Sequence, residues 1–211
     1  MYVPSHFVVT DRAQLIAWMG QFGFALLVST GADGAPLATH LPLLHVDDGS
    51  AHGKLVGHVA RANPHWKLFD GQAQAHSMAM FWGPHAYVSP NWYANKLNVP
   101  TWNYITIHAY GAPRIVEGQA EVLALLGDLV ATYEAGSADP WSMEKLPPGY
   151  AANTSRGIVA FEMPIARLQG KAKLSQNKTA ADRAGVIAAL EARGGDDNTA
   201  TAGAMRALDG K

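Results

Sequence analysis

Residues 24–46, FALLVSTGADGAPLATHLPLLHV, decide the fold. FALLVST (24–30) is a short apolar run typical of a strand, and it stops at the turn-forming residues GADGAP (31–36). PLATHLPLLHV (36–46) then alternates well enough to be the hairpin partner of the first run. A tight hairpin early in the chain indicates a β-rich protein.

The rest of the chain supports this interpretation. Six or seven strands with short turns come first, and the longer helices are grouped late, which favours a mainly β protein with flanking helices (α+β) over an alternating βαβ fold. The further strands are expected at 54–61, 77–83, 85–90, 101–118 and from 156 onward, and the helices at 10–22, 63–71, 119–136 and 179–194.

Length and composition predict one domain over residues 1–194, followed by a polar tail over 195–211 that is short of apolar anchors. The net charge of -1 and the pI of about 6.7 are not those of a typical nucleic-acid-binding domain. The chain has no cysteine, which excludes disulfides and thiolate sites. We see no signal peptide and no apolar run long enough for a membrane helix, so a soluble cytoplasmic protein is expected.

No familiar catalytic or metal-binding pattern is present. The nine histidines include no HExxH, and the serines lie in no GxSxG. GxGxxG and Walker sequences are also absent. We therefore assign no catalytic residue and no metal ligand.

The end of the strand at 54–61 is a candidate anion site. Arg61 is followed by Asn63-Pro64, which ends a strand and begins a helix, so a guanidinium, an amide and free helix N–H groups would converge there. This arrangement suits a phosphate. The alternative is that Arg61 is a surface residue and Asn63 a simple helix cap.

Two further segments can also be interpreted either as ligand-binding or as purely structural. THLP (39–42) places a proline in a strand, which marks an edge whose backbone groups could bond a flat heterocycle, or only a kinked edge that binds nothing. KAKLSQNK (171–178) alternates two lysines before a set of neutral polar residues. It could bind an anion, or be a solvated edge strand with a helix cap.

A set of rings surrounds GPHAYVSPNWY (83–93). Such rings usually form core or subunit interface, and a minority could line a planar ligand. The set comprises Trp82, His85, Tyr87, Trp92, Tyr93, Trp102 and Tyr104.

Several of these strings occur in one order that resembles the PaiB-type FMN-binding negative transcriptional regulators, within the flavin-binding split-barrel class that also contains pyridoxamine-phosphate oxidases. The resemblance runs from residue 1 to about residue 194. The strings are MYVPSHF (1–7), THLPLL (39–44), GHVARANPHW (57–66), GPHAYVSPNWY (83–93), VPTWNY (99–104), HAYG (108–111), GKAKLSQNK (170–178) and DRAGVIAAL (182–190).

The resemblance implies a six-stranded split β-barrel and a homodimer with FMN in a cleft between subunits. It implies that Arg61, Asn63 and His58 form the phosphate end of the flavin site, and that Thr39, His40, Leu41 and Pro42 run along the ring. Lys173, Gln176 and Asn177 would close the site, with Trp102 and Asn103 supplied by the other subunit.

The resemblance leaves the activity open. The first hypothesis is an FMN-binding regulator that senses redox state or a small ligand. The alternatives are a flavin-dependent oxidoreductase for a small molecule, a haem-binding or haem-degrading protein, and a scaffold that has lost its ligand. Direct DNA binding is implied by the family label, but no recognition motif or basic arm supports it.

Overall fold

The structure is a computed structural model that describes residues 1–70 and 77–209. The chain forms two compact units, each built from separate segments. Unit 1 comprises Met1–Trp18, Trp82–His108 and Gln169–Lys211, and unit 2 comprises Met19–Phe81 and Ala109–Leu168. Four elements have residues in both units: α1 (Arg12–Gln21), β6 (Ser77–Val88), β7 (Thr101–Gly111) and β9 (Ile158–Lys173).

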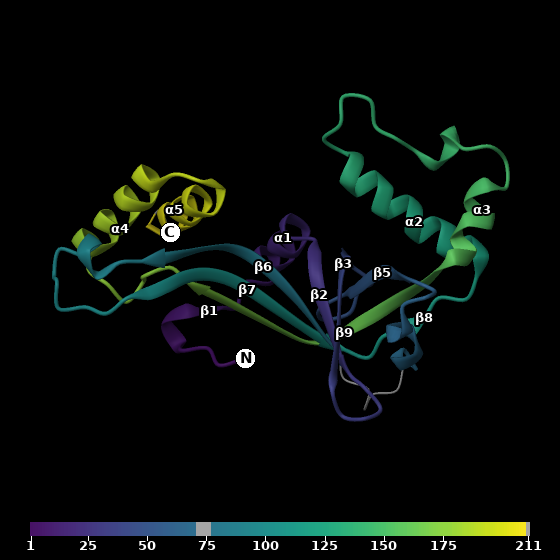
Figure 1. The fold of residues 1–211 in the computed structure, drawn as a ribbon, viewed down its shortest axis with the longest axis horizontal. Coiled ribbons are helices and arrows are strands. Elements are labelled where there is room, and N and C mark those ends of the chain that lie inside the picture. The colour runs from purple at the N-terminus through teal and green to yellow at the C-terminus, as the bar shows by residue number, and fades with distance from the viewer. Residues whose placement is uncertain (71–76, 210–211) are drawn as a thin grey trace. The chain divides into compact units, whose positions relative to one another are not determined.

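The strands pair in one continuous order. Neighbours run β3-β2-β6-β7-β9-β5-β4, and β1 and β8 also pair with β9. Of the nine described strands, three have only two or three residues, which leaves six long ones; the predicted number therefore corresponds to the long strands. Besides β6, β7 and β9 (Figure 1), they are β1 (Val8–Val9), β2 (Phe24–Thr30), β3 (Pro36–Pro42), β4 (Leu44–Val46), β5 (Lys54–Ala60) and β8 (Arg114–Ile115).

The expected hairpin is confirmed over residues 24–42, whereas residues 44–46, expected to continue its second strand, form β4 and pair with β5. Residues 24–30 pair in register with 36–42, from Phe24 opposite Pro42 to Thr30 opposite Pro36. The two strands expected at 77–83 and 85–90 are wrong in one respect, because β6 runs through Gly83 and Pro84 without a break. The Gly-Ala-Pro of 111–113 does interrupt the next segment, separating β7 from β8.

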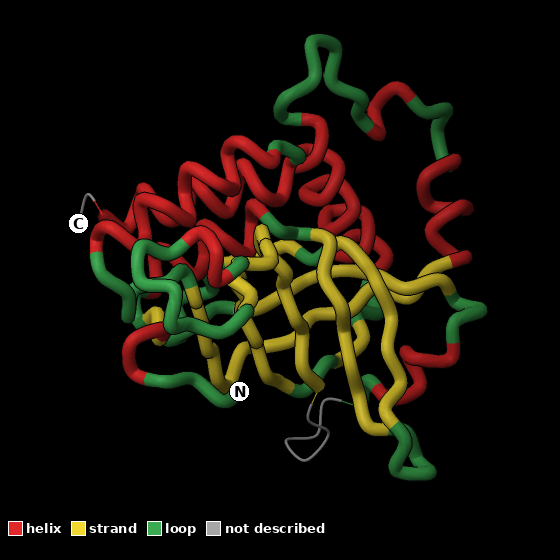
Figure 2. The backbone as a smooth tube through the Cα atoms, turned by 60° about the vertical axis from the view of Figure 1, so that its left-hand side comes forward, coloured by secondary structure: helices red, strands yellow, loops and turns green. Residues whose placement is uncertain are grey.

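The core of unit 2 lies on one face of the β2–β3–β6 strands and under α2 (Gln119–Glu134). Phe69 and Phe161 pack with ring centroids 4.6 Å apart. The apolar face of α2 covers β5 and β9 through Val122, Leu125 and Leu129. Short helical elements complete the unit: η2 (Pro64–Leu68), η4 (Met143–Lys145), α3 (Tyr150–Thr154) and η5 (Ser155–Gly157). Figure 2 distinguishes helices in red from strands in yellow along the part of the chain that the structure describes.

Unit 1 ends in two neighbouring helices, α4 (Ala180–Arg193) and α5 (Asp196–Asp209), shown in yellow-green and yellow in Figure 1. Gly194 and Gly195 both have positive φ, which lets the chain reverse within two residues. The predicted polar tail is wrong over residues 196–209, because this segment is helical and buries Ala202 and Met205. The other elements of the unit are η1 (Ser5–Phe7) and η3 (Pro90–Trp92).

Substitution of two glycines in these helices by alanine should have opposite effects on the free energy of unfolding. A Cβ on Gly185 of α4 would lie 2.2 Å from the carbonyl oxygen of Trp92, whereas a Cβ on Gly203 of α5 would meet nothing within 4 Å. We expect Gly185→Ala to lower the free energy of unfolding by about 1–3 kcal/mol through overpacking, and Gly203→Ala to raise it by about 0.5–1 kcal/mol through helix propensity. Urea denaturation of the two variants tests this, and equal effects would contradict the packing of α4.

Candidate functional site

A chain of hydrogen bonds connects Thr39 of β3 to the beginning of η2. The Asn63 side-chain amide donates to Thr39 Oγ1 at 3.0 Å, and Thr39 Oγ1 lies 2.8 Å from His65 Nδ1. Asn63 also caps η2, because its Oδ1 accepts from the His65 backbone N–H at 3.0 Å. Asn63 is thus a helix cap and also joins another predicted site residue.

The same chain continues into the core of unit 2. His65 is fully buried, its Nε2 lies 2.8 Å from Ser29 Oγ, and Ser29 Oγ lies 2.5 Å from Ser77 Oγ. Burial lowers the pKa of His65, so its ring is neutral and uses one nitrogen as donor and the other as acceptor. Sequence reasoning did not select His65, Ser29 or Ser77; the Asn-Pro-His sequence of the helix start was the available signal.

The rest of the THLP segment lies on an edge strand, since β3 stands at one end of the strand order. The prediction from its proline is therefore consistent with the structure. His40 is exposed and stacks on Phe24 with ring centroids 6.2 Å apart. Leu41 is buried and Pro42 half-buried.

His58 lies on β5, and one of its ring nitrogens is without a hydrogen-bond partner among the described residues. Burial lowers the pKa of its imidazole, so the ring is neutral near pH 7. Its Nδ1 is buried and has no hydrogen-bond partner among the described residues. Because an unmade hydrogen bond in a buried position is costly, such an atom marks a place where a ligand could bind.

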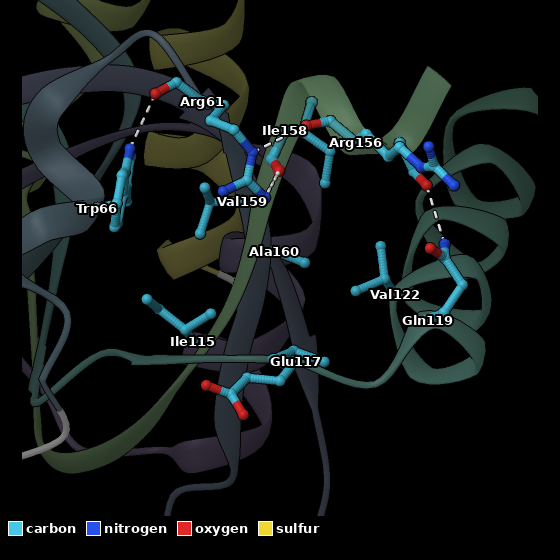
Figure 3. Close-up of a pocket in the computed structure, with 12 residues that line it drawn as sticks. Arg61, Trp66, Ile115, Glu117, Gln119, Val122, Arg156, Ile158, Val159 and Ala160 are labelled. Atoms are coloured by element: carbon cyan, nitrogen blue, oxygen red, sulfur yellow. Dashed lines mark hydrogen bonds between the residues drawn. The ribbon is translucent and has the colours of Figure 1, made fainter. Parts of the chain in front are cut away.

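Arg61 points away from the end of β5 toward the start of β9. Its Nε donates to the Arg156 carbonyl at 2.8 Å and its Nη2 to the Ile158 carbonyl at 3.0 Å, which leaves Nη1 for a ligand (Figure 3). Trp66 of η2 donates from its indole nitrogen to the Arg61 carbonyl at 2.9 Å. Arg61 and Trp66 line a pocket of about 510 Å³ in unit 2.

The other predicted residues belong to unit 1. Lys173 donates to Thr101 Oγ1 and, at 2.7 Å, to the Trp102 carbonyl. Burial and the nearby charges of Lys171 and Lys178 lower the pKa of Lys173. An anion would relieve this repulsion between like charges.

Asn103 and Gln176 are occupied by the chain itself. Asn103 is buried and donates to Ser175 Oγ at 3.0 Å, while Gln176 bonds the backbone of Leu174 and Ala172 at 2.7 and 2.5 Å. These bonds hold the bend at Ser175, whose φ is +64°. Asn177 is exposed.

The rings around GPHAYVSPNWY form an exposed cluster in unit 1. Trp102 lies 6.1 Å from His85 and 6.0 Å from Tyr87 between ring centroids, and Tyr87 lies 6.4 Å from Trp92. Trp82 and Trp102 are 60% and 53% exposed, which is unusual for tryptophan and favours a binding surface. Tyr93 is instead buried.

The residues of unit 2 fit a flavin nucleotide. They offer a guanidinium for a phosphate, an imidazole nitrogen without a partner, and an edge strand whose outward backbone groups are not used by β2. Among the described residues, no three His, Asp or Glu side chains gather as a metal site would require. None of the described helices is long and apolar enough to cross a membrane.

Comparison with known proteins agrees with this fit. Residues 1–167 match the family model described as "Putative FMN-binding domain". Protease synthase and sporulation protein PAI 2 of Bacillus subtilis is 36% identical over 191 residues, which cover 90% of this chain and 89% of that protein.

Solved structures show the fold. The FAD and heme binding protein of Mycobacterium smegmatis has a TM-score of 0.60 and 17% identity, over 90% of this chain and 80% of that one. The flavocytochrome Anf3 of Azotobacter vinelandii also has a TM-score of 0.60, with 16% identity, over 78% and 68%.

The fold and these matches define a flavin-binding split-barrel protein, as the resemblance predicted. The chain belongs to the PaiB-type FMN-binding family, and its cofactor is FMN.

The buried histidines predict a pH dependence of stability. Because the pKa values of His58 and His65 are lowered in the folded state, the unfolded chain binds more protons once the pH falls below about 6.5. The free energy of unfolding should therefore be fully retained above that pH and decrease below it. Urea denaturation at pH 7.5 and 5.5 measures the difference.

Two variants test whether His65 contributes to this pH dependence of the free energy of unfolding. We expect His65→Gln to reduce the difference in unfolding free energy between the two pH values, and His40→Gln, which changes an exposed ring, to leave it as in the wild type. An unchanged difference in His65→Gln would mean that the imidazole is not buried in its neutral form.

Proposed function

We propose that this FMN-binding protein acts as a homodimeric regulator of the PaiB type, in which the flavin senses redox state or a small ligand. Thr39, Asn63, His58 and Arg61, all in unit 2, carry the proposal. Asn63 is bonded to Thr39, Arg61 keeps Nη1 for a phosphate, and His58 Nδ1 lacks a partner among the described residues. The bound flavin supplies the electron-transfer chemistry.

In this proposal the chain itself binds and orients the cofactor. Arg61 Nη1 contacts the phosphate, and the guanidinium is held in place by its bonds to the Arg156 carbonyl of η5 and the Ile158 carbonyl of β9. His58 Nδ1 gains the hydrogen-bond partner that it lacks. Thr39 to Pro42 line the ring along the edge strand. The further residues implied by the resemblance, Lys173, Asn177 and Trp102, lie in unit 1, where Asn103 and Gln176 hold the bend at Ser175.

The homodimer is supported by an uncovered apolar sheet face in unit 2. The register places Leu26 of β2 between His40 and Met80, and Val28 between Ala38 and Met78. Leu26, Val28, Met78 and Met80 are only half-buried, although the residues that alternate with them are buried. A sheet with apolar residues on both faces is typical of a subunit interface. We call these four residues the open face.

Regulation through direct DNA contact has no support in the helices of unit 1. Helix α5 begins with Asp196 and Asp197, and its Arg206 is paired with Glu191 of α4 at 2.7 Å. A recognition helix needs free basic side chains along one face. The proposed regulator therefore acts through a partner or through redox chemistry.

An absorption spectrum of the purified protein, before and after addition of FMN, tests the proposal. We expect a flavin spectrum that differs from that of free FMN. A haem band would instead support the haem-binding alternative. Steady turnover of a nicotinamide donor would show an oxidoreductase and contradict a purely sensing role.

Arg61→Ala should weaken FMN binding about 10- to 100-fold, because a charge-assisted phosphate contact contributes roughly 1.5–3 kcal/mol. Titration of FMN into apoprotein measures the affinity. Arg156→Ala is the matched control: it removes a neighbouring guanidinium outside the proposed flavin set and should leave the affinity unchanged. Equal affinities of wild type and Arg61→Ala would place the phosphate elsewhere.

Met80→Glu should dissociate the dimer, since a carboxylate at the centre of an apolar interface raises the dissociation constant by about 100-fold or more. Sedimentation velocity at micromolar concentration gives the oligomeric state. Leu97→Glu, which changes a side chain that is 92% exposed in unit 1, should remain dimeric. A dimer in both variants would exclude the open face as the interface.

A further inference from the structure

The proposed flavin contact involves Arg61, which is one of the twelve residues that line the neighbouring pocket. The other lining residues are available to a second ligand. The pocket lies between η2, the β8–α2 connection and the start of β9, all within unit 2 (Figure 3). Its volume of about 510 Å³ is within the range of small-molecule sites. Seven of its twelve lining residues are apolar: Trp66, Ile115, Val116, Val122, Ile158, Val159 and Ala160.

The charged side chains of the pocket favour an anion. Arg61 and Arg156 line it together with a single carboxylate, Glu117. Arg156 is exposed, and its guanidinium has no hydrogen bond or ion pair with any residue that the structure describes. A guanidinium has five N–H donors in a planar fork that matches a carboxylate. Arg156 is therefore available to an oxyanion at the rim.

The neighbouring polar groups are already held in place. Gln119 donates from Nε2 to Ser155 Oγ at 3.0 Å, and Ser155 donates to the Ala152 carbonyl at 3.0 Å. Figure 3 shows Gln119 beside Arg156, across the pocket from Trp66. The Trp66 ring is held in place by its bond to the Arg61 carbonyl. A ligand could therefore pack on this ring and contact the polar side chains opposite it without a rearrangement of the protein.

We propose that this pocket is a second ligand site, which binds a small organic acid with a flat apolar body. The carboxylate pairs with the Arg156 guanidinium, and the body packs between Trp66 and Ile115. The site goes beyond FMN binding, and it requires that the flavin phosphate does not occupy the Arg156 side of this pocket. Such an acid is the kind of small ligand that a sensing protein could respond to.

A carboxylate fits the pocket better than an amine or a neutral molecule. An amine would meet two arginines and only one glutamate, and a neutral molecule would leave the Arg156 charge without a partner. The oxyanion could also come from the FMN phosphate, since both anions use the same donors. The experiment therefore includes FMN as a separate ligand.

Benzoate is the probe, and benzamide is its uncharged counterpart of the same shape. The full chain is labelled with ¹⁵N-tryptophan, and the indole signal of Trp66 is assigned by its loss in Trp66→Phe. We expect benzoate to shift this signal with a dissociation constant of about 1–10 mM, as its few heavy atoms allow. Benzamide should bind at least about 10-fold more weakly.

Three variants locate the probe. Arg156→Gln should weaken benzoate binding by about 10-fold or more and leave FMN affinity unchanged. Ile115→Trp, on the short strand β8, should block the pocket without altering a buried residue, because Ile115 is 36% exposed. Arg193→Gln, which removes an exposed arginine of α4, is the matched control and should bind benzoate as the wild type does.

The outcomes separate this inference from the proposed function. Absence of a Trp66 shift, equal binding of benzamide, or unchanged binding in Arg156→Gln would each overturn the site. Loss of FMN affinity in Arg156→Gln, with displacement of benzoate by FMN, would also overturn it by assigning the pocket to the flavin phosphate. Benzoate binding that depends on Arg156, in a protein that binds no FMN, would leave this site standing and remove the proposed flavin sensor.

Discussion

A neutral histidine in the core of unit 2 is the interaction on which its arrangement depends. His65 connects η2 to β2 and β3 through Ser29 and Thr39, and Ser29 extends the connection to β6 through Ser77. In a buried position each missing bond would cost about 1–3 kcal/mol, so the network tolerates only one arrangement of these elements. This arrangement fixes Asn63, and Arg61 two residues before it, at the end of β5.

Most of the long strands were predictable because they are apolar runs or alternate apolar and polar residues, and several stop near glycine or proline. The hairpin at 24–42 needs only local information. Helix α5 was missed because its buried positions are occupied by small residues such as Thr201 and Ala202, which carry little hydrophobic signal. The break at 83–84 was expected from Gly-Pro, but pairing within the strand order outweighs that local preference.

The sequence predicted which residue types form the candidate site, but it did not predict the hydrogen-bond partner of each side chain. Arg61 and His58 have free nitrogens, as a ligand-binding residue should. Asn103 and Gln176 are equally polar, yet their donors are used by Ser175 and by the backbone of β9. Sequence cannot separate these cases, because the partner of a side chain can lie far away along the chain, as Ser175 lies 72 residues from Asn103. The pocket of Figure 3 could not be predicted from the sequence for the same reason, because η2, β8 and β9 are far apart in the chain and come together only on folding.

The two units are not consecutive stretches of chain. Their boundaries fall inside α1, β6, β7 and β9 rather than in loops, so the polypeptide passes from one unit to the other in the middle of regular structure. A protease that cuts at exposed loops would therefore not release either unit intact. Neither could be exchanged between relatives as a single gene segment. The two units are distinct in their packing, but neither corresponds to a continuous stretch of the chain. A change of one unit by recombination would therefore have to exchange several separate segments at once.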